Sequence, residues 1–139
     1  MTEQRLQYEL VLWLGQTYPN HRRLLFQVNN DARTARVELG MVAGVSDLIF
    51  ITPKGEVLAI ELKAPNTRHN VAHLKNQISW GAEVEEVGGL FLMSKNLEDI
   101  KAIIRNLIDG SFERAIELIK MNNNYFKKLV ETNKKTIKV

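Results

Sequence analysis

The sequence predicts one α/β domain in which a mixed β-sheet is flanked by helices. An amphipathic helix comes first, two apolar strands joined by a tight turn lie in the middle, and a second helix then leads to another apolar strand. The chain has 139 residues, 45% of them hydrophobic and 25% charged, which suits one domain with a substantial core. We assign the core to residues 1–110 and a helical, basic extension of the same domain to residues 111–139.

Each helix is predicted from apolar residues that recur at intervals of three and four. The first helix covers residues from about 2 to 17, the second from about 68 to 87, and the third from 94 to 107. Residues 24–28 and 90–93 are short apolar runs, and we interpret them as strands. This order of elements predicts a sheet covered by helices.

Residues 44–51 and 56–63 are predicted to form a β-hairpin around a turn at residues 52–55. A proline followed two residues later by a glycine, between two apolar runs, is typical of a tight loop whose glycine has a positive φ. If Thr52 faces Glu56 across this loop, the register of both strands follows.

This register places Asp47 opposite Glu61, with the two carboxylates close together. Because side chains alternate along a strand, Lys63 shares a face with Glu61, whereas Leu62 points to the other face. Adjacent carboxylates repel each other unless a cation lies between them, and oxygen ligands favour Mg²⁺ or Mn²⁺. A lysine beside such a metal can orient a water or neutralise charge on a phosphate. The pattern is typical of a metal-dependent phosphodiesterase.

The alternative is that these residues are solvated charges at the ends of strands, where charged residues are common. The position of Glu61 favours catalysis, because this residue follows the apolar run at residues 57–60 and precedes Leu62. A carboxylate on such a strand costs free energy unless a cation or a hydrogen-bond donor compensates it.

Further motifs extend this pattern over residues from about 3 to about 107. In chain order they are Glu3 with Leu6 and Gln7, Asn29-Asn30, Gly44-Val45-Ser46-Asp47-Leu48, Ile60-Glu61-Leu62-Lys63, and Gln77 with Trp80. In these motifs the chain resembles a stand-alone VRR-NUC (virus-type replication-repair nuclease) domain, a branch of the PD-(D/E)XK nuclease superfamily. That family usually has proline before its metal-binding aspartate, where this chain has Ser46, and proline contributes no chemistry there.

The resemblance implies a PD-(D/E)XK (restriction-endonuclease-like) core and a Mg²⁺-dependent endonuclease that acts on DNA. Asp47 and Glu61 would bind the metal, with the backbone carbonyl of Leu62 as a further ligand. Lys63 would orient the attacking water or stabilise the pentavalent phosphate.

Glu3 and Gln77 are two further candidates for the site. On a helical wheel Glu3 falls near the middle of the apolar stripe of the first helix, although a first-turn glutamate is also favoured by the helix dipole alone. Gln77 lies among the core positions of the second helix, where a buried amide must find partners. With the resemblance, we expect Glu3 to complete the acidic shell and Gln77 to orient one of its members.

Two other polar features have simpler interpretations. His69 and His73 are four residues apart in the second predicted helix, but no third nitrogen or sulfur ligand is near them in sequence, so we expect surface or DNA-facing histidines. Residues 121–124 are polar, and we interpret them as a linker that precedes a lysine-rich tail.

The net charge of +3 is unevenly distributed. Residues 120–138 contain six lysines and one acid, Glu131, and a second basic cluster combines residues 21–23 with Arg33 and Arg36. Such clusters favour nucleic acid, because each neutralised phosphate releases counterions. We expect Arg33 and Arg36 to contact DNA, whereas a solubilising tail explains the C-terminal lysines equally well.

The resemblance also bears on assembly and substrate. Small VRR-NUC proteins resemble phage junction-resolving enzymes, which implies a homodimer that acts on branched DNA, such as the four-way (Holliday) junction of DNA repair. A broad apolar stripe on the third helix is a candidate dimer face, formed by Ile100, Ile103, Ile104, Leu107 and Ile108. The alternatives are a nuclease for linear, flap or nicked DNA, and a non-catalytic DNA-binding module, which would have no use for adjacent carboxylates facing phosphates.

Composition excludes several classes of site and of protein. Without cysteine the chain cannot form disulfides or thiolate zinc sites. No apolar run approaches the roughly 20 residues that span a bilayer, and the N-terminal residues contain no signal-peptide core. We expect an intracellular, cytoplasmic protein of phage or bacterial type.

Overall fold

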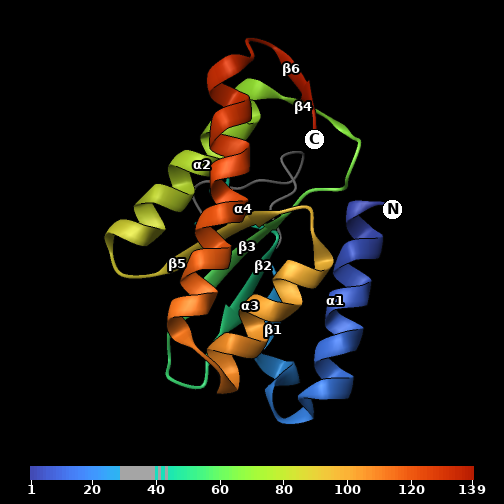
Figure 1. Ribbon diagram of the computed structural model, residues 1–139, viewed down its shortest axis with the longest axis vertical. Helices are drawn as coiled ribbons and strands as arrows, with labels where there is room; N and C mark the ends of the chain where they lie inside the picture. The colour runs from blue at the N-terminus through green and yellow to red at the C-terminus, as the bar shows by residue number, and fades with distance from the viewer. Residues whose placement is uncertain (29–39, 41, 43) are drawn as a thin grey trace.

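The computed structural model describes residues 1–28, 40, 42 and 44–139. In this part of the chain, strands pair in the order β1-β2-β3-β5, and β4 and β6 form a small separate pair. β1, β2 and β3 are antiparallel, and β5 runs parallel to β3. The predicted α/β class, a mixed sheet flanked by helices, is confirmed (Figure 1). In chain order the elements are α1 (Glu3–Thr17), the 3₁₀ helix η1 (Pro19–Leu24), β1 (Leu25–Gln27), β2 (Leu48–Ile51), β3 (Val57–Leu62), β4 (Arg68–Asn70), α2 (Val71–Glu86), β5 (Leu90–Ser94), α3 (Leu97–Asp109), α4 (Phe112–Thr132) and β6 (Thr136–Lys138).

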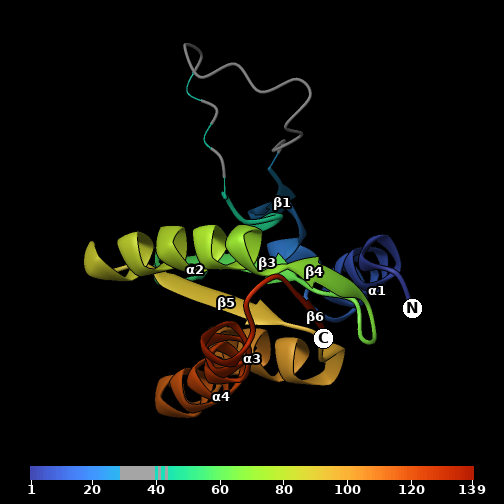
Figure 2. The same ribbon diagram turned by 90° about the horizontal axis from the view of Figure 1, so that it is seen from above.

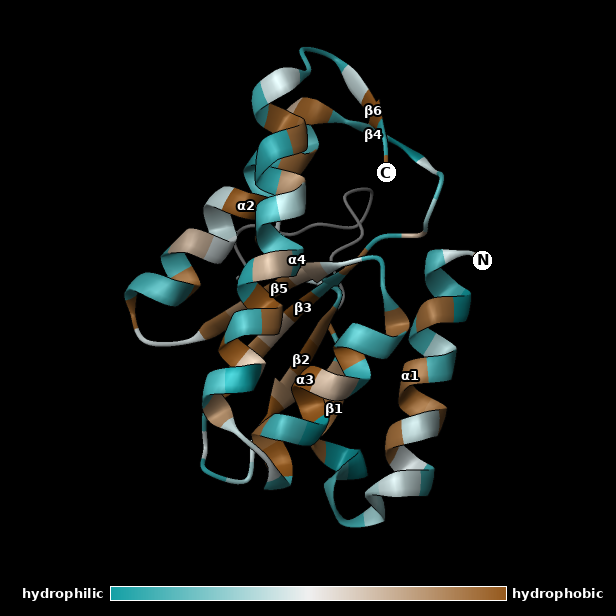
Figure 3. Ribbon diagram, viewed as in Figure 1, coloured by the Kyte–Doolittle hydropathy of each residue, from teal (hydrophilic) through white to brown (hydrophobic). Residues whose placement is uncertain are grey.

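Helices cover both faces of the sheet, with α2 on one side and α3 and α4 on the other (Figure 2). One face carries Ile60 and Leu62 into a core shared with α1, α3 and the first half of α4. The other face carries Ala59 and Phe91 towards α2. Because side chains alternate, Glu61 lies on this second face beside Ala59. Apolar residues dominate the central strands (Figure 3).

None of the helices in the described part of the chain is long and apolar enough to cross a membrane.

The predicted hairpin and its register are confirmed. Leu48 pairs with Ile60, and at the turn the amide of Thr52 donates to the carbonyl of Glu56 at 2.9 Å. Gly55 has a φ of +86°, a backbone conformation that glycine adopts without steric cost. The turn therefore sets which residues face each other at the far ends of both strands.

A close contact between α2 and β5 holds α2 over the sheet. Gly81 faces Phe91, and a Cβ built at this glycine would lie 2.3 Å from the Phe91 ring. A larger residue would force the helix away from the strand. Trp80 adds an edge-to-face contact to the same ring, with centroids 6.3 Å apart. This contact positions Gln77, one turn earlier on α2.

Two helices begin later than predicted, and the first strand of the hairpin begins at Leu48 instead of residue 44. The second helix begins at Val71, because residues 68–70 form β4, which pairs with β6 from the other end of the chain. The third helix begins at Leu97, because Ser94 belongs to β5, where it pairs with the end of β3. At the start of both helices, long-range strand pairing replaces the local helical pattern.

The prediction of a linker at residues 121–124 is wrong, because these residues lie inside α4. Asn123 is buried there, and its Oδ1 accepts a hydrogen bond from the amide of Met93 at 2.7 Å. Its Nδ2 donates to the carbonyl of Phe91 at 2.8 Å. The asparagine side chain thus takes the place of a neighbouring strand at the edge of β5.

Replacing Asn123 by alanine should lower the free energy of unfolding by about 2–4 kcal/mol, because two buried main-chain groups of β5 lose their partner. Chemical denaturation measures this change. Asn124→Ala, at an exposed position on the same helix, is the control and should change stability by less than about 0.5 kcal/mol. Equal effects of the two substitutions would contradict the edge-capping role.

The apolar stripe of α3 is used inside the chain. Ile100, Ile103 and Ile104 are buried in the core with α1 and the sheet, and Ala115 and Leu118 of α4 join the same cluster. Contrary to the prediction, this stripe is not available as a dimer face, because α4 folds back onto it.

Candidate active site

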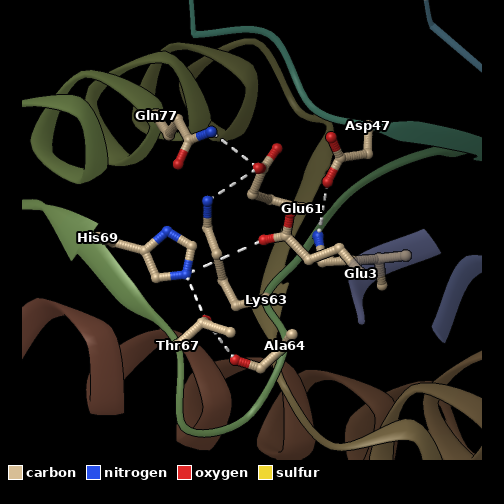
Figure 4. Close-up of polar contacts among 9 residues, drawn as sticks. Glu3, Asp47, Glu61, Lys63, Ala64, Thr67, His69 and Gln77 are labelled. Carbon is tan, nitrogen blue, oxygen red and sulfur yellow. Dashed lines mark hydrogen bonds and ion pairs between the residues drawn. The ribbon is translucent and has the colours of Figure 1, made fainter. Parts of the chain in front are cut away.

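Side chains from α1, β3, β4, α2 and the segment before β2 meet around one cavity of about 220 Å³ at the C-terminal end of β3. All five residues predicted to be catalytic line it together with His69 (Figure 4). His73 lines it as well. The lining residues are Glu3, Gly44, Val45, Asp47, Glu61, Lys63, His69, His73 and Gln77.

The strand register brings Asp47 to the cavity. This residue lies one position before β2, and the pairing of Leu48 with Ile60 directs it towards Glu61. Its Oδ2 accepts a hydrogen bond from the amide of Leu62 at 3.0 Å, and its carbonyl accepts one from the amide of Val28 at 2.9 Å. Asp47 is thus held from both neighbouring strands.

Glu61 is the most deeply placed acid of the site, with 2% of its surface exposed. Its Oε1 accepts hydrogen bonds from Nε2 of Gln77 at 2.7 Å and from Nζ of Lys63 at 3.1 Å. Its Oε2 is buried and has no hydrogen-bond partner among the described residues. A buried carboxylate oxygen without a donor is costly when it carries charge.

The environment of Glu61 favours its protonated form. Burial is the largest cause and the charge of Asp47 adds to it, so that together they raise the pKa of Glu61 from 4.5 to about 8 despite the opposing charge of Lys63. A cation beside Glu61 would replace this proton, because its positive charge stabilises the ionised carboxylate.

Lys63 and Gln77 approach the same oxygen from different elements. Lys63 follows β3, is 3% exposed, and its amide donates to the carbonyl of Ser94 at 3.0 Å. Gln77 is buried on α2, and its Oε1 has no partner among the described residues. The prediction that its amide must find partners at the active-site edge of the sheet is half met, because only the NH₂ group has one.

Glu3 lies at the rim of the cavity, with its side chain 45% exposed. Burial raises its pKa; Lys63 opposes this rise, and Asp47 adds to it. Oε1 of Glu3 is 4.0 Å from Nε2 of His69. The same His69 nitrogen is 2.8 Å from Oγ1 of Thr67, which donates its proton to the carbonyl of Ala64 at 2.6 Å. Thr67 therefore accepts from His69, which fixes the tautomer with hydrogen on Nε2.

Sequence reasoning missed the two histidines as members of this site. Burial, followed by the charge of Lys63, lowers the pKa of both His69 and His73. The sequence signal was their spacing of four, but a helix extended back to residue 68 conceals that His69 lies on β4. The N-cap Asn70, which accepts from the amide of His73, could have marked this break.

The predicted DNA contacts Arg33 and Arg36, and the Asn29-Asn30 motif, lie outside the described residues.

Among solved structures, the chain is similar to a protein described as a VRR_NUC domain protein, with a TM-score of 0.63 and 17% sequence identity, over 79% of this chain and 90% of that one. At this identity the similarity shows the fold alone, so the fold that the resemblance to VRR-NUC domains implied is confirmed. No family model matches the chain, and no curated protein does.

The raised pKa of Glu61 predicts how metal-free stability depends on pH. Between pH 4.5 and about 8 the folded chain holds a proton that the unfolded chain has lost, so the contribution of Glu61 to stability falls as pH rises. In EDTA, the free energy of unfolding of the wild type relative to Glu61→Gln should fall by at least about 1 kcal/mol between pH 5 and pH 8. Urea denaturation of both proteins measures this difference, and parallel pH profiles would contradict it.

Proposed function

We propose that this chain is a Mg²⁺-dependent endonuclease that hydrolyses phosphodiester bonds in DNA. The convergence of Asp47, Glu61 and Lys63 in one cavity carries this proposal. A fold that only binds DNA has no need of two carboxylates here, since they repel phosphate. The VRR-NUC fold supports the same reading.

The donor set fits a hard divalent cation. Glu61 Oε2 is buried without a partner among the described residues, and carboxylate and carbonyl oxygens suit Mg²⁺, with Mn²⁺ as a substitute. Asp47, Glu61 and the backbone carbonyl of Leu62 would hold the ion. When bound, Mg²⁺ polarises a phosphate and lowers the pKa of a water. In the described part of the chain, no three His, Cys, Asp or Glu side chains form a metal-binding group, so main-chain and water oxygens would complete the coordination.

Lys63 is placed to act on the reacting phosphate. Its ammonium carries three donors, of which Glu61 takes one at 3.1 Å. During hydrolysis the water oxygen bonds to phosphorus and releases a proton to solvent, one ester P–O bond breaks, and the leaving oxygen takes a proton from solvent. Lys63 would orient the water or neutralise the negative charge that gathers on the phosphate, and it is held in place before the reaction begins.

Glu3 and Gln77 support the acidic pair in this proposal. Gln77 holds Glu61 in one orientation through its 2.7 Å hydrogen bond. Glu3 adds a carboxylate at the rim, where it can complete the acidic shell through water. Arg33 and Arg36 stay proposed contacts to DNA phosphates.

Asp47→Asn, Glu61→Gln and Lys63→Met should each lower the cleavage rate by about 10²-fold or more, with DNA binding largely kept, because they remove groups that act on the reacting phosphate. Glu3→Gln and Gln77→Ala should slow cleavage by more than threefold. Single-turnover cleavage of plasmid DNA with Mg²⁺ measures these rates.

The control for this series is Glu9→Gln, which removes a carboxylate from α1 outside the cavity and should leave the rate unchanged. Full activity of Asp47→Asn, or of the wild type in excess EDTA, would refute the mechanism. Changes below threefold in both Glu3→Gln and Gln77→Ala would remove these two residues from it.

We also propose branched DNA, such as a four-way junction, as the substrate and a homodimer as the active form, inside the cell. A junction needs two cuts, and one chain with one carboxylate pair supplies one active centre. Two copies related by a two-fold axis would supply both. Because α4 covers the stripe of α3, the dimer would have to use another surface.

A dimer should show twice the chain mass of 15.9 kDa in light scattering at micromolar concentration. It should cut a four-way junction in pairs near the branch point, with affinity that falls steeply as salt rises. Linear duplex of matched sequence is the control. A monomeric mass together with equal cleavage of both DNAs would leave a simpler nuclease for linear, flap or nicked DNA.

A further inference from the structure

A second, larger cavity of about 640 Å³ lies next to the candidate active site, between α1, η1 and the edge strand β1. This volume is within the roughly 300–1,000 Å³ that ligand-binding pockets occupy. Tyr8 of α1 and Phe26 of β1 line it with 56% and 44% of their surfaces exposed. Arg22 and Arg23 of η1 line it as well, and the described residues around it include no acid.

We infer that this cavity, named here the aromatic groove, binds unpaired nucleotides of a DNA strand whose phosphate lies in the active site. The inference rests on the proposed nuclease function and deepens it. It assigns base stacking to Tyr8 and Phe26 and backbone contacts to Arg22 and Arg23.

The aromatic groove and the candidate active site are lined by neighbouring residues of α1 and of the start of β2. Leu48, which lines the groove, directly follows Asp47, and Gln7, also in its lining, is one helical turn after Glu3. A DNA strand with one phosphate at the carboxylates would therefore meet the groove next.

The sheet places Phe26 on the same face as the carboxylates. Phe26 pairs with Ile49, and Ile49 shares a face with Asp47 because side chains alternate along β2. The amide of Val28 donates to the carbonyl of Asp47, so Val28 lies beside Asp47. Phe26 is two residues before Val28 on the same segment. With a strand spacing of about 4.8 Å and a rise of about 3.3 Å per residue, the Cα atoms of Phe26 and Asp47 are about 8 Å apart. That distance is only a few nucleotides along a DNA strand.

The chemistry of the lining fits single-stranded DNA. Every base has a face that can stack on an exposed aromatic ring, whereas duplex bases are already stacked on each other. The guanidinium carbon of Arg5 lies 5.2 Å from the centre of the Tyr8 ring, within the range of a cation–π contact. Arg22 is held towards the groove by its hydrogen bond to the carbonyl of Leu25 at 3.1 Å.

Charge argues against a second copy of the chain as the occupant. A two-fold interface joins the same patch on both copies. At this surface Arg22 and Arg23 would meet only residues of the same lining, and the described lining contains no acid to pair with them.

The test compares a blunt DNA hairpin with the same hairpin carrying an unpaired tail. Fluorescence anisotropy in EDTA measures both dissociation constants without cleavage, and their ratio gives the preference for the tail. The double variant Tyr8→Ala with Phe26→Ala should reduce this preference about fivefold or more, as expected for the loss of stacked bases. Tyr8→Phe should keep the preference, because the ring remains.

The matched control is Leu12→Ala, at an exposed apolar position one turn further along α1 that does not line the groove. It should keep the wild-type preference. Thermal melting checks that all variants are folded. The substituted side chains are exposed, so we expect little loss of stability.

A smaller reduction in the double variant, or a wild type without any preference for the tail, would overturn the inference. So would a fall in mass by light scattering in the double variant, which would identify a self-association face. Binding of the tail with the expected preference, but no cleavage in Mg²⁺, would refute the nuclease proposal and leave the groove. Cleavage by a wild type that has no preference for the tail would refute the groove alone.

Discussion

The candidate site depends on the pairing of β2 with β3. The turn sets the register, and the register brings Asp47 to the end of the strand that carries Glu61. The bond from the amide of Leu62 to Asp47 then ties the first carboxylate to the strand of the second. A slip of one residue would turn Glu61 and Lys63 to the opposite face of the sheet, into the core formed by Ile60 and Leu62. The acidic pair and the core therefore specify the same register.

Burial gives this pair its chemical character. Glu61 and Lys63 are almost fully enclosed, and the bonds from Gln77 and Lys63 satisfy one oxygen of Glu61 while the other has no partner in the described structure. A buried charge pair of this kind contributes little to stability by itself, because desolvation offsets the attraction. This arrangement fits the proposed role of Glu61 in holding a cation. The free energy lost in burying these charges is offset by packing elsewhere in the core, where the contact of Gly81 with Phe91 holds α2 over the sheet.

The C-terminal part of the chain supports the site from a distance. α4 covers α3. Its Asn123 side chain also forms hydrogen bonds with the main chain at the edge of β5. β6 pairs with β4, which carries His69 to the cavity beside Glu3. Residues far from the carboxylates along the chain thus determine where one wall of the cavity lies.

The sequence by itself determined the hairpin, its register and the grouping of Asp47, Glu61 and Lys63, because turn geometry and strand alternation are local rules that act over a few residues. Periodicity also indicated that Gln77 is buried and that Glu3 lies on the side of α1 that reaches the cavity. Only the tertiary structure decided that β4 replaces the first turn of the second helix, that Asn123 is a buried partner of β5, and that α4 occupies the stripe of α3. Each of these depends on a contact between segments distant along the chain, and local propensity carries no information about which distant segment will supply it. For the same reason the sequence did not show that His69, on β4, lies in the cavity.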